Sequence, residues 1–149
     1  HAGGAAGGIE SPPRASVIQV KRAYDPAARS DGVRILVERL WPRGMTQQAL
    51  LADSWAKEAA PSTELPKWFD HRAERWDEFR RRYRAELEQN PAAWEPILRE
   101  ARRGTVTLLY SARDTEHNGA LVLQGYLAGQ AKARGLAAAR KQNKLASAG

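Results

Sequence analysis

The chain has 149 residues, which is enough for one domain with a substantial core, and its 42% hydrophobic and 28% charged residues are ordinary for a globular protein. It contains no cysteine, which excludes disulfides, thiolate nucleophiles and cysteine-ligated metal centres. No apolar run approaches the roughly 18 residues that cross a bilayer, and no secretory signal is visible. We therefore expect a cytoplasmic protein with no membrane partner.

The net charge of +7 is concentrated near the carboxyl terminus. Residues 130–149 contain five basic residues and no acidic one, so the preceding 129 residues carry only +2. Such a tail can hold nucleic acid or acidic surfaces loosely, although a solvated, frayed terminus accounts for the same composition. We divide the chain into a disordered leader at 1–15, a folded domain at 16–129 and a basic, frayed tail at 130–149.

Two strands and two short helices are predicted in the first half of the domain. Residues 17–20 form a β-branched run, and residues 33–40 alternate apolar and polar side chains, which is typical of strands. Thr46 is placed to cap a short helix through Ala52, and Ser62 to cap another.

The clearest helix is predicted over residues 73–88. Its apolar side chains recur at spacings of three and four and form one face: Trp76, Phe79, Tyr83 and Leu87. Asn90 and Pro91 begin the next helix and Gly104 ends it, while Pro96 either kinks this helix or delays its start.

Residues 105–110 are almost all apolar or β-branched, which predicts a central strand buried on both faces. A final helix follows Asp114. Strands separated by helical stretches imply right-handed crossovers. The expected fold is therefore α/β, a single compact domain in which a small sheet with parallel strand pairs is flanked by helices.

Each of the three predicted strands ends in polar or aromatic side chains. Parallel strands would bring these ends to one edge of the sheet, where open α/β sheets bind ligands. Arginine forks beside a helix amino terminus suit phosphate or carboxylate, and an aromatic ring can stack on a planar group. The candidate ligand-binding residues are Arg22, Arg39, Trp41, Arg43, Tyr110, Asn118 and, from a second cluster, His71.

Asp114 and His117 are the candidate catalytic pair, because their spacing places both on one side of a helical turn where they could move a proton. Structural alternatives stand beside these roles. Asp114 could cap the helix and His117 could be a surface residue. Arg39 could pair with Glu38 or Asp114, and Trp41 could lie at the rim of the core.

Other chemistries find little support. Ser62 as a nucleophile lacks an evident base and oxyanion hole, so capping is its preferred role. His71 and His117 show no recognised metal-ligand spacing with Asp70 or Asp114, so we predict no metal site. No glycine-rich phosphate loop is present, and the sequence leaves the cofactor unknown.

Several short motifs occur in order along the chain: Arg39-Leu-Trp-Pro-Arg-Gly44, Ala60-Pro-Ser62, Glu64-Leu65, Lys67-Trp-Phe69, His71, Phe79, Arg82-Tyr83, Asn90-Pro91, Leu108-Leu-Tyr110, Ala112, Asp114, His117 and Asn118. On these motifs the chain resembles the YeaO-like branch of domain-of-unknown-function family 488, over residues 17–127. The resemblance implies a compact cytoplasmic α/β domain and no established function. The chain departs from the family pattern at Glu38, Pro66, Pro96 and Ser111, and the tail lies outside the resemblance.

Three hypotheses of function follow. The first is a site for an anionic or nucleotide-like small molecule at the strand carboxyl ends, with or without catalysis. The second is association with nucleic acid through the basic tail and residues 80–84, which would weaken steeply with salt. The third is a non-catalytic interaction module whose tryptophans bury against a partner or a second copy. The oligomeric state is left open.

Overall fold

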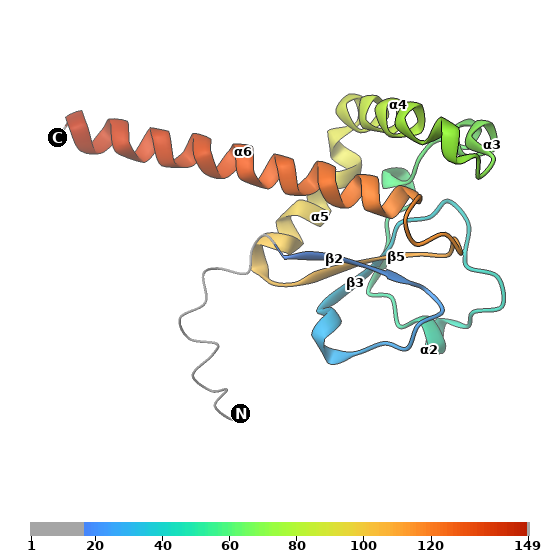
Figure 1. Cartoon of the computed structure of the whole chain (residues 1–149). Coiled ribbons are helices and arrows are strands. Elements are labelled where there is room, and N and C mark those ends of the chain that lie inside the picture. The colour runs from blue at the N-terminus through green and yellow to red at the C-terminus, as the bar shows by residue number, and fades with distance from the viewer. Residues whose placement is uncertain (1–16, 149) are drawn as a thin grey trace.

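In the computed structural model, residues 17–148 are described, with the backbone alone from residue 136 onward. Four parallel strands form one sheet in the order β2-β5-β3-β4. The strands are β2 (Ile18–Arg22), β3 (Val33–Leu36), β4 (Ser54–Trp55) and β5 (Val106–Tyr110). This architecture confirms the predicted α/β class with parallel strand pairs (Figure 1). The leader expected at 1–15 lies outside the described residues.

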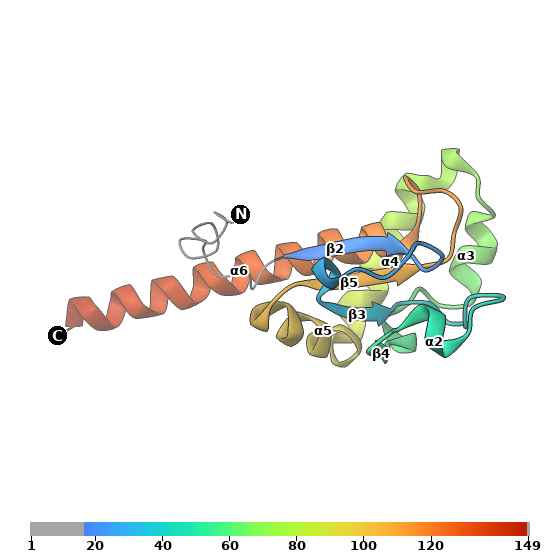
Figure 2. The ribbon, with the colours of Figure 1, turned by 90° about the horizontal axis from the view of Figure 1, so that it is seen from below.

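The helices form an uneven cover on the two faces of the sheet. They are α2 (Gln47–Leu50), α3 (Glu64–Phe69), α4 (Trp76–Gln89), α5 (Pro91–Arg103) and α6 (Gly119–Ala148), with short 3₁₀ turns at Arg29–Asp31, Lys57–Ala59 and Ala73–Arg75. Helices α4, α5 and α6 lie on one side of the sheet, and α2 lies on the other (Figures 1 and 2).

Strand β5 is central, and all five of its residues are buried, as its composition predicts. Alternate residues face opposite sides. Leu108 and Ile35 belong to the main core under the helices, whereas Leu109 and Leu36 belong to a small core on the other face. Leu50 completes that second core, which explains why the loop carrying α2 folds under the sheet.

The second strand is shorter than predicted. It ends at Leu36, not at residue 40, because its pairing partner β5 ends at Tyr110. The Val37 N–H still donates to the Leu109 carbonyl at 3.1 Å, but Leu40 is 79% exposed. Strand β4 was not predicted, because two exposed residues carry no alternating pattern.

The helix caps agree with prediction in one case and differ in two. Thr46 Oγ1 accepts the Ala49 N–H at 3.0 Å, which confirms the predicted cap of α2. Ser62 does not cap α3, because its hydroxyl donates to Glu86 Oε2 at 2.6 Å instead. Helix α6 begins at Gly119, and Asn118, not Asp114, accepts a backbone N–H of its first turn.

Helices α4 and α5 follow the predicted pattern closely. Helix α4 begins at Trp76, after a 3₁₀ turn that occupies the first residues of the predicted span. Helix α5 begins at Pro91 and contains Pro96 without a delayed start.

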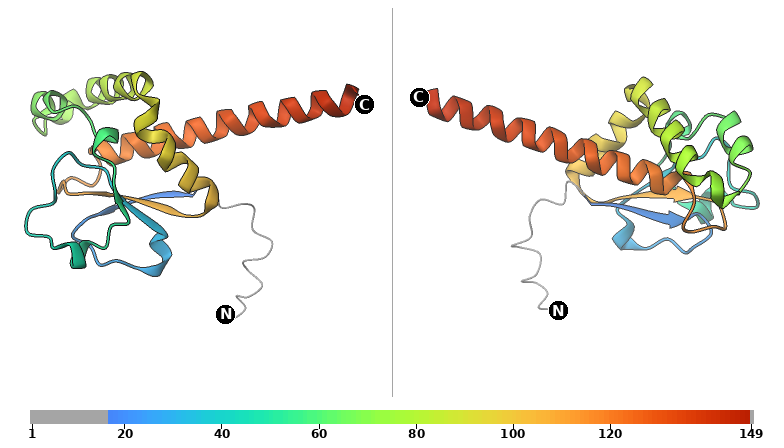
Figure 3. Two further views of the ribbon diagram at one scale, coloured as in Figure 1. Left: turned by 180° about the vertical axis from the view of Figure 1, so that it is seen from behind. Right: turned by 45° about the horizontal axis from the view of Figure 1, so that its top comes forward.

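Helix α6 projects well beyond the sheet and the other helices (Figure 3). Its backbone continues across the stretch from residue 130 for which the composition predicts a frayed tail. Arg134 Nη2 lies 3.1 Å from Glu95 Oε2 of α5, so this basic residue has an acidic partner. Within residues 17–148, no helix combines the length and the apolar character needed to cross a membrane.

Candidate functional site

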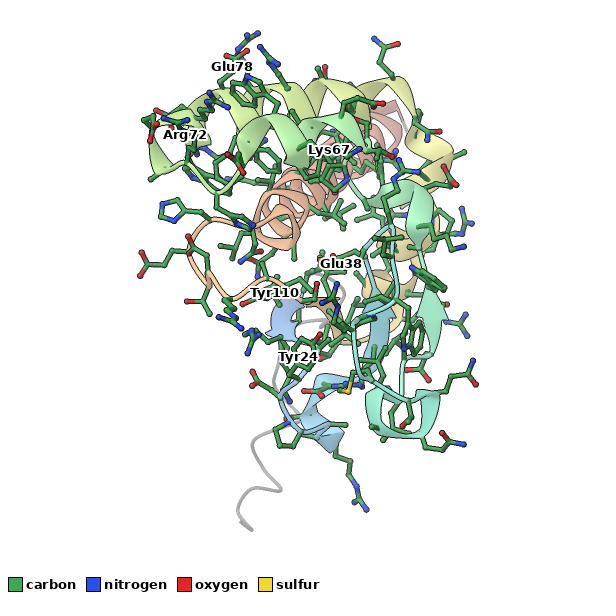
Figure 4. All side chains as sticks on the ribbon, turned by 90° about the vertical axis from the view of Figure 1, so that its right-hand side faces the viewer. Tyr24, Glu38, Lys67, Arg72, Glu78 and Tyr110 are labelled. Carbon is green, nitrogen blue, oxygen red and sulfur yellow. The ribbon has the colours of Figure 1, made fainter. Side chains whose placement is uncertain are left out.

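The carboxyl ends of β2, β3 and β5 lie along one edge of the sheet, as expected for parallel strands. Figure 4 looks onto this edge. Tyr24, Glu38 and Tyr110 lie near its centre, below the helical layer that carries Lys67 and Arg72. The candidate residues divide between two parts of the edge, one where β2 and β5 end and one where β3 ends.

At the ends of β2 and β5, Arg22 is held by the loop that follows β5. Its Nε donates to the Ala112 carbonyl at 2.9 Å, and its guanidinium carbon lies 5.2 Å from the centre of the Tyr24 ring. Tyr110 is only 4% exposed, and burial raises the pKa of its phenol. A buried Tyr110 offers no open ring for stacking, so Tyr24, which is 40% exposed, is the aromatic residue available there.

The predicted pair of Asp114 and His117 is in contact, with Oδ2 and Nδ1 3.0 Å apart. Asp114 Oδ1 also accepts the backbone N–H groups of Glu116 and His117, so the carboxylate caps a turn before α6. The Glu116 N–H, chiefly, holds the pKa of Asp114 below its usual range. Asn118 ties the turn to α6, because its amide donates to the Asp114 carbonyl.

At the end of β3, Arg39 holds the loop that follows β4. Its Nε donates to the Pro61 carbonyl at 3.0 Å and its Nη2 to the Ala60 carbonyl at 3.3 Å. Its Nη1 lies 3.3 Å from Glu58 Oε1, so Arg39 pairs with Glu58 and not with Glu38 or Asp114. A guanidinium carries five N–H groups, so these three bonds leave two N–H groups without a partner among the described residues.

A cavity of about 270 Å³ opens beside Arg39, on the helical side of the sheet edge. Its polar lining includes Glu58, Ser62 and Glu86, and Tyr83 and Leu87 of α4 form part of its wall. Glu86 is fixed in place by Ser62, whose N–H and hydroxyl donate to its two oxygens at 2.9 and 2.6 Å. We call this the carboxyl-edge cavity.

Three other candidates do not line this cavity. The Trp41 indole donates to the Met45 carbonyl at 2.6 Å and packs against the small core, as expected if Trp41 lies at the rim of the core. Arg43 is exposed, and its carbonyl accepts the Tyr24 hydroxyl at 2.9 Å. His71 is exposed, with its ring 6.5 Å from that of Phe69.

Glu38 lies at the same edge of the sheet, although the sequence marks it only as a possible partner of Arg39 and as a departure from the family pattern. It follows β3, and its carboxylate accepts the N–H of Ser111 at 3.3 Å and its hydroxyl at 3.2 Å. Burial raises the pKa of Glu38, and these two bonds only partly offset that rise. An acidic residue directly after an apolar strand was the signal that could have found it.

Glu38→Gln is expected to raise the free energy of unfolding at pH 7 by up to about 1 kcal/mol, because it removes the cost of a buried charge. The raised pKa means that the folded protein binds a proton on Glu38 more readily than the unfolded chain does. The contribution of Glu38 to the stability of the wild-type fold is therefore present at low pH and is lost as pH rises through the raised pKa of its carboxyl. Urea unfolding should show the gain at pH 7 and a smaller gain near pH 4. A variant less stable than wild type at both pH values would contradict this account.

The arginines of residues 80–84 are largely paired with acids. Arg80 lies 2.6 Å from Asp77, and Arg81 and Arg82 both pair with Glu78. These pairs reduce the positive charge that this helix face offers to nucleic acid. Among side chains of residues 17–135, no group of three histidines, aspartates or glutamates could hold a metal ion.

The fold defines a small α/β protein with a parallel sheet and a cavity between the loop that follows β3 and helix α4. A family model described as "Inactive DUF488-N3 subclade" matches residues 17–147. The uncharacterized protein YeaO of Escherichia coli is 49% identical over 110 residues, which cover 74% of this chain and 96% of YeaO. The uncharacterized protein Rv3073c of Mycobacterium tuberculosis is 36% identical over 117 residues, covering 78% of this chain and 98% of that protein. No solved structure matches significantly.

The chain therefore belongs to the DUF488 family and is a YeaO-like member of it. This confirms the family that the sequence motifs indicate. The names of these relatives state no activity.

Proposed function

We propose that the protein binds a small molecule bearing both an anionic group and hydroxyl groups, as a nucleotide does, in the carboxyl-edge cavity. The observation that carries the proposal is the lining of the cavity, where the partly exposed Arg39 guanidinium lies beside the carboxylates of Glu58 and Glu86. Two N–H groups of Arg39 can hold an anionic oxygen, and carboxylates accept hydrogen bonds from hydroxyl groups.

The same lining argues against a simple anion as the ligand. Glu58 and Glu86 would repel a bare phosphate that approached Arg39. A ligand that also carries hydroxyl groups would donate hydrogen bonds from them to these two carboxylates. The volume of about 270 Å³ lies at the small end of ligand sites, so it suits the sugar and phosphate portion of a nucleotide.

We propose binding without catalysis. The family model that the chain matches is described as inactive. Asp114 is engaged by two backbone N–H groups, and its lowered pKa makes it a weak base. The nucleic-acid alternative is less favoured, because three arginines of α4 and Arg134 of α6 are in ion pairs.

Isothermal titration calorimetry of the full chain should show that AMP and ribose 5-phosphate bind more tightly than inorganic phosphate or adenosine alone. Within this cavity, inorganic phosphate can use only Arg39, and adenosine can use only the carboxylates of Glu58 and Glu86. Each should therefore bind at least about 10-fold more weakly than AMP, a difference of about 1.4 kcal/mol in binding free energy. AMP recovered unchanged after long incubation would agree with binding without catalysis. Phosphate that binds as tightly as AMP, or AMP that fails to bind at about 1 mM, would contradict the proposal.

A further inference from the structure

A groove of about 560 Å³ lies between strand β4 and helix α5. One wall is formed by residues 54–58, and the other by residues between 92 and 100 of α5. We call it the α5 groove. It is about twice as large as the carboxyl-edge cavity, and its volume lies within the usual range of small-molecule sites.

The α5 groove and the carboxyl-edge cavity follow the same two stretches of chain. On one wall, residues 54–58 line the groove and the lining of the cavity continues to Ser62. On the other wall, the groove is lined from residues 92–100, and the cavity from Asn90, directly before α5. Glu58 lines both. The two hollows therefore meet at Glu58, and one molecule can extend from the cavity into the groove.

The floor of the α5 groove is apolar. Ile35 and Ile97 line it, and each is 2% exposed and belongs to the main core. Ala56 on the strand side and Ala93 on the helix side have short side chains, which leave space between the two walls. Water in such a space is displaced favourably by an apolar group.

Trp55 also lines the groove, but its ring packs on the other side of the sheet. Trp55 pairs in register with Leu36 of the small core, and its ring centre lies 5.4 Å from that of Trp41. Its indole N–H donates to the Glu38 carbonyl at 2.6 Å. Successive residues of a strand face opposite sides, so Ser54 faces the side of the groove. A molecule in the groove would therefore contact Ser54 and α5, and not the face of the indole.

Polar groups lie among the lining residues of the groove. They include the hydroxyl of Ser54 and the carboxylates of Glu58 and Glu100. An aliphatic chain would cover these groups without forming hydrogen bonds to them, which costs free energy. A heterocyclic base has apolar faces for the floor, and its edge carries N–H donors and acceptors for these polar groups.

We propose that the α5 groove binds the base of the nucleotide whose sugar and phosphate occupy the carboxyl-edge cavity. This inference rests on the function proposed above, because a phosphate at Arg39 and a ribose at Glu58 place the base at the entrance of the groove. The cavity of about 270 Å³ suits the sugar and phosphate alone, and the adjoining groove supplies the apolar surface that the base requires.

Calorimetric titration of the full chain with AMP and with ribose 5-phosphate tests the inference. AMP should bind at least about 10-fold more tightly, because the faces of its base are removed from water in the groove. Ala93→Leu fills the groove from α5, and Ser54→Leu fills it from β4. Each should lower the affinity for AMP to about that for ribose 5-phosphate. Neither should change the binding of ribose 5-phosphate, because neither residue lines the carboxyl-edge cavity.

Ala85→Leu is the matched control, because Ala85 is exposed on α4 and lines neither hollow. It should leave both affinities unchanged. Ser54 is exposed as well, so Ser54→Leu should keep the thermal unfolding of wild type even if Ala93→Leu disturbs the packing of α5.

The two proposals fail in different ways. If neither AMP nor ribose 5-phosphate binds, the proposed function fails, and this inference fails with it. If both bind with equal affinity, the carboxyl-edge site stands and the base does not occupy the groove. AMP that keeps its tighter binding in both Ala93→Leu and Ser54→Leu would also overturn the inference, because the base would then bind elsewhere.

Discussion

Asp31→Ala is expected to lower the free energy of unfolding by about 3–5 kcal/mol, because it leaves the Arg34 guanidinium charged and buried without its partner. Asp31 and Arg34 are 3% and 4% exposed, and they form an ion pair under the sheet. Lys21 Nζ lies 3.1 Å from the same carboxylate. Arg34 also donates to the Leu50 carbonyl, so it links β3 to the loop that carries α2.

Urea unfolding of Asp31→Ala against Asp77→Ala would measure this effect. Asp77 pairs with Arg80 on an exposed helix face, and breaking such a pair should cost less than about 1 kcal/mol. An Asp31→Ala variant within 1 kcal/mol of wild type, a limit that we take from the cost of exposed pairs, would show that the buried pair is dispensable.

The same network predicts a dependence on pH. Burial alone would raise the pKa of Asp31, but hydrogen bonds from the Ala28 N–H, Lys21 and Arg34 outweigh burial and hold it below its ordinary value. A lowered carboxyl pKa stabilises the fold above the unfolded pKa of about 3.9, and this contribution is lost as pH falls through the lower, folded value. The stability difference between wild type and Asp31→Asn should therefore be largest near neutral pH and shrink below about pH 4.

Arg39→Gln is expected to weaken the binding of AMP by about 10- to 100-fold, the usual loss when a charged hydrogen-bond donor is removed. Arg39→Lys should weaken it less, because the lysine keeps the charge but loses the planar fork. Calorimetric titration would measure both variants, with Arg102→Gln on the exposed end of α5 as the control for net charge.

Arg39 also holds the loop after β4 through the Ala60 and Pro61 carbonyls, so each variant needs a check of its thermal unfolding. An Arg39→Gln variant that folds like wild type and binds AMP equally well would remove Arg39 from the site.

Local patterns were sufficient to predict most of the regular structure. The apolar run ending at Tyr110 is a central strand, and the spacing of Phe79, Tyr83 and Leu87 places one buried face on α4. Burial follows from such patterns because a strand or helix must hide its apolar side. Strand β4 has no apolar period, so it exists only because β3 offers it a pairing edge.

The site was harder to predict, because its contacts join residues far apart in the chain. The parallel strands do bring Arg22, Tyr110 and Asp114 to one edge of the sheet, as expected. However, the partners of Arg39 lie about twenty residues further along, in a loop without a sequence period. The buried Arg34 interrupts an apolar strand, and only the fold shows that Asp31 compensates its charge.

The measurement that tests the proposed site most directly is an NMR titration of the isotope-labelled full chain with AMP. We expect the backbone amides of Arg39, Ser62 and Glu86 to shift together and to saturate with one dissociation constant, because all three residues line the carboxyl-edge cavity. Shifts confined to the carboxyl end of β2 or to α6 would contradict the assignment of the ligand to this cavity. No saturable shift at about 1 mM AMP would contradict nucleotide-like binding itself.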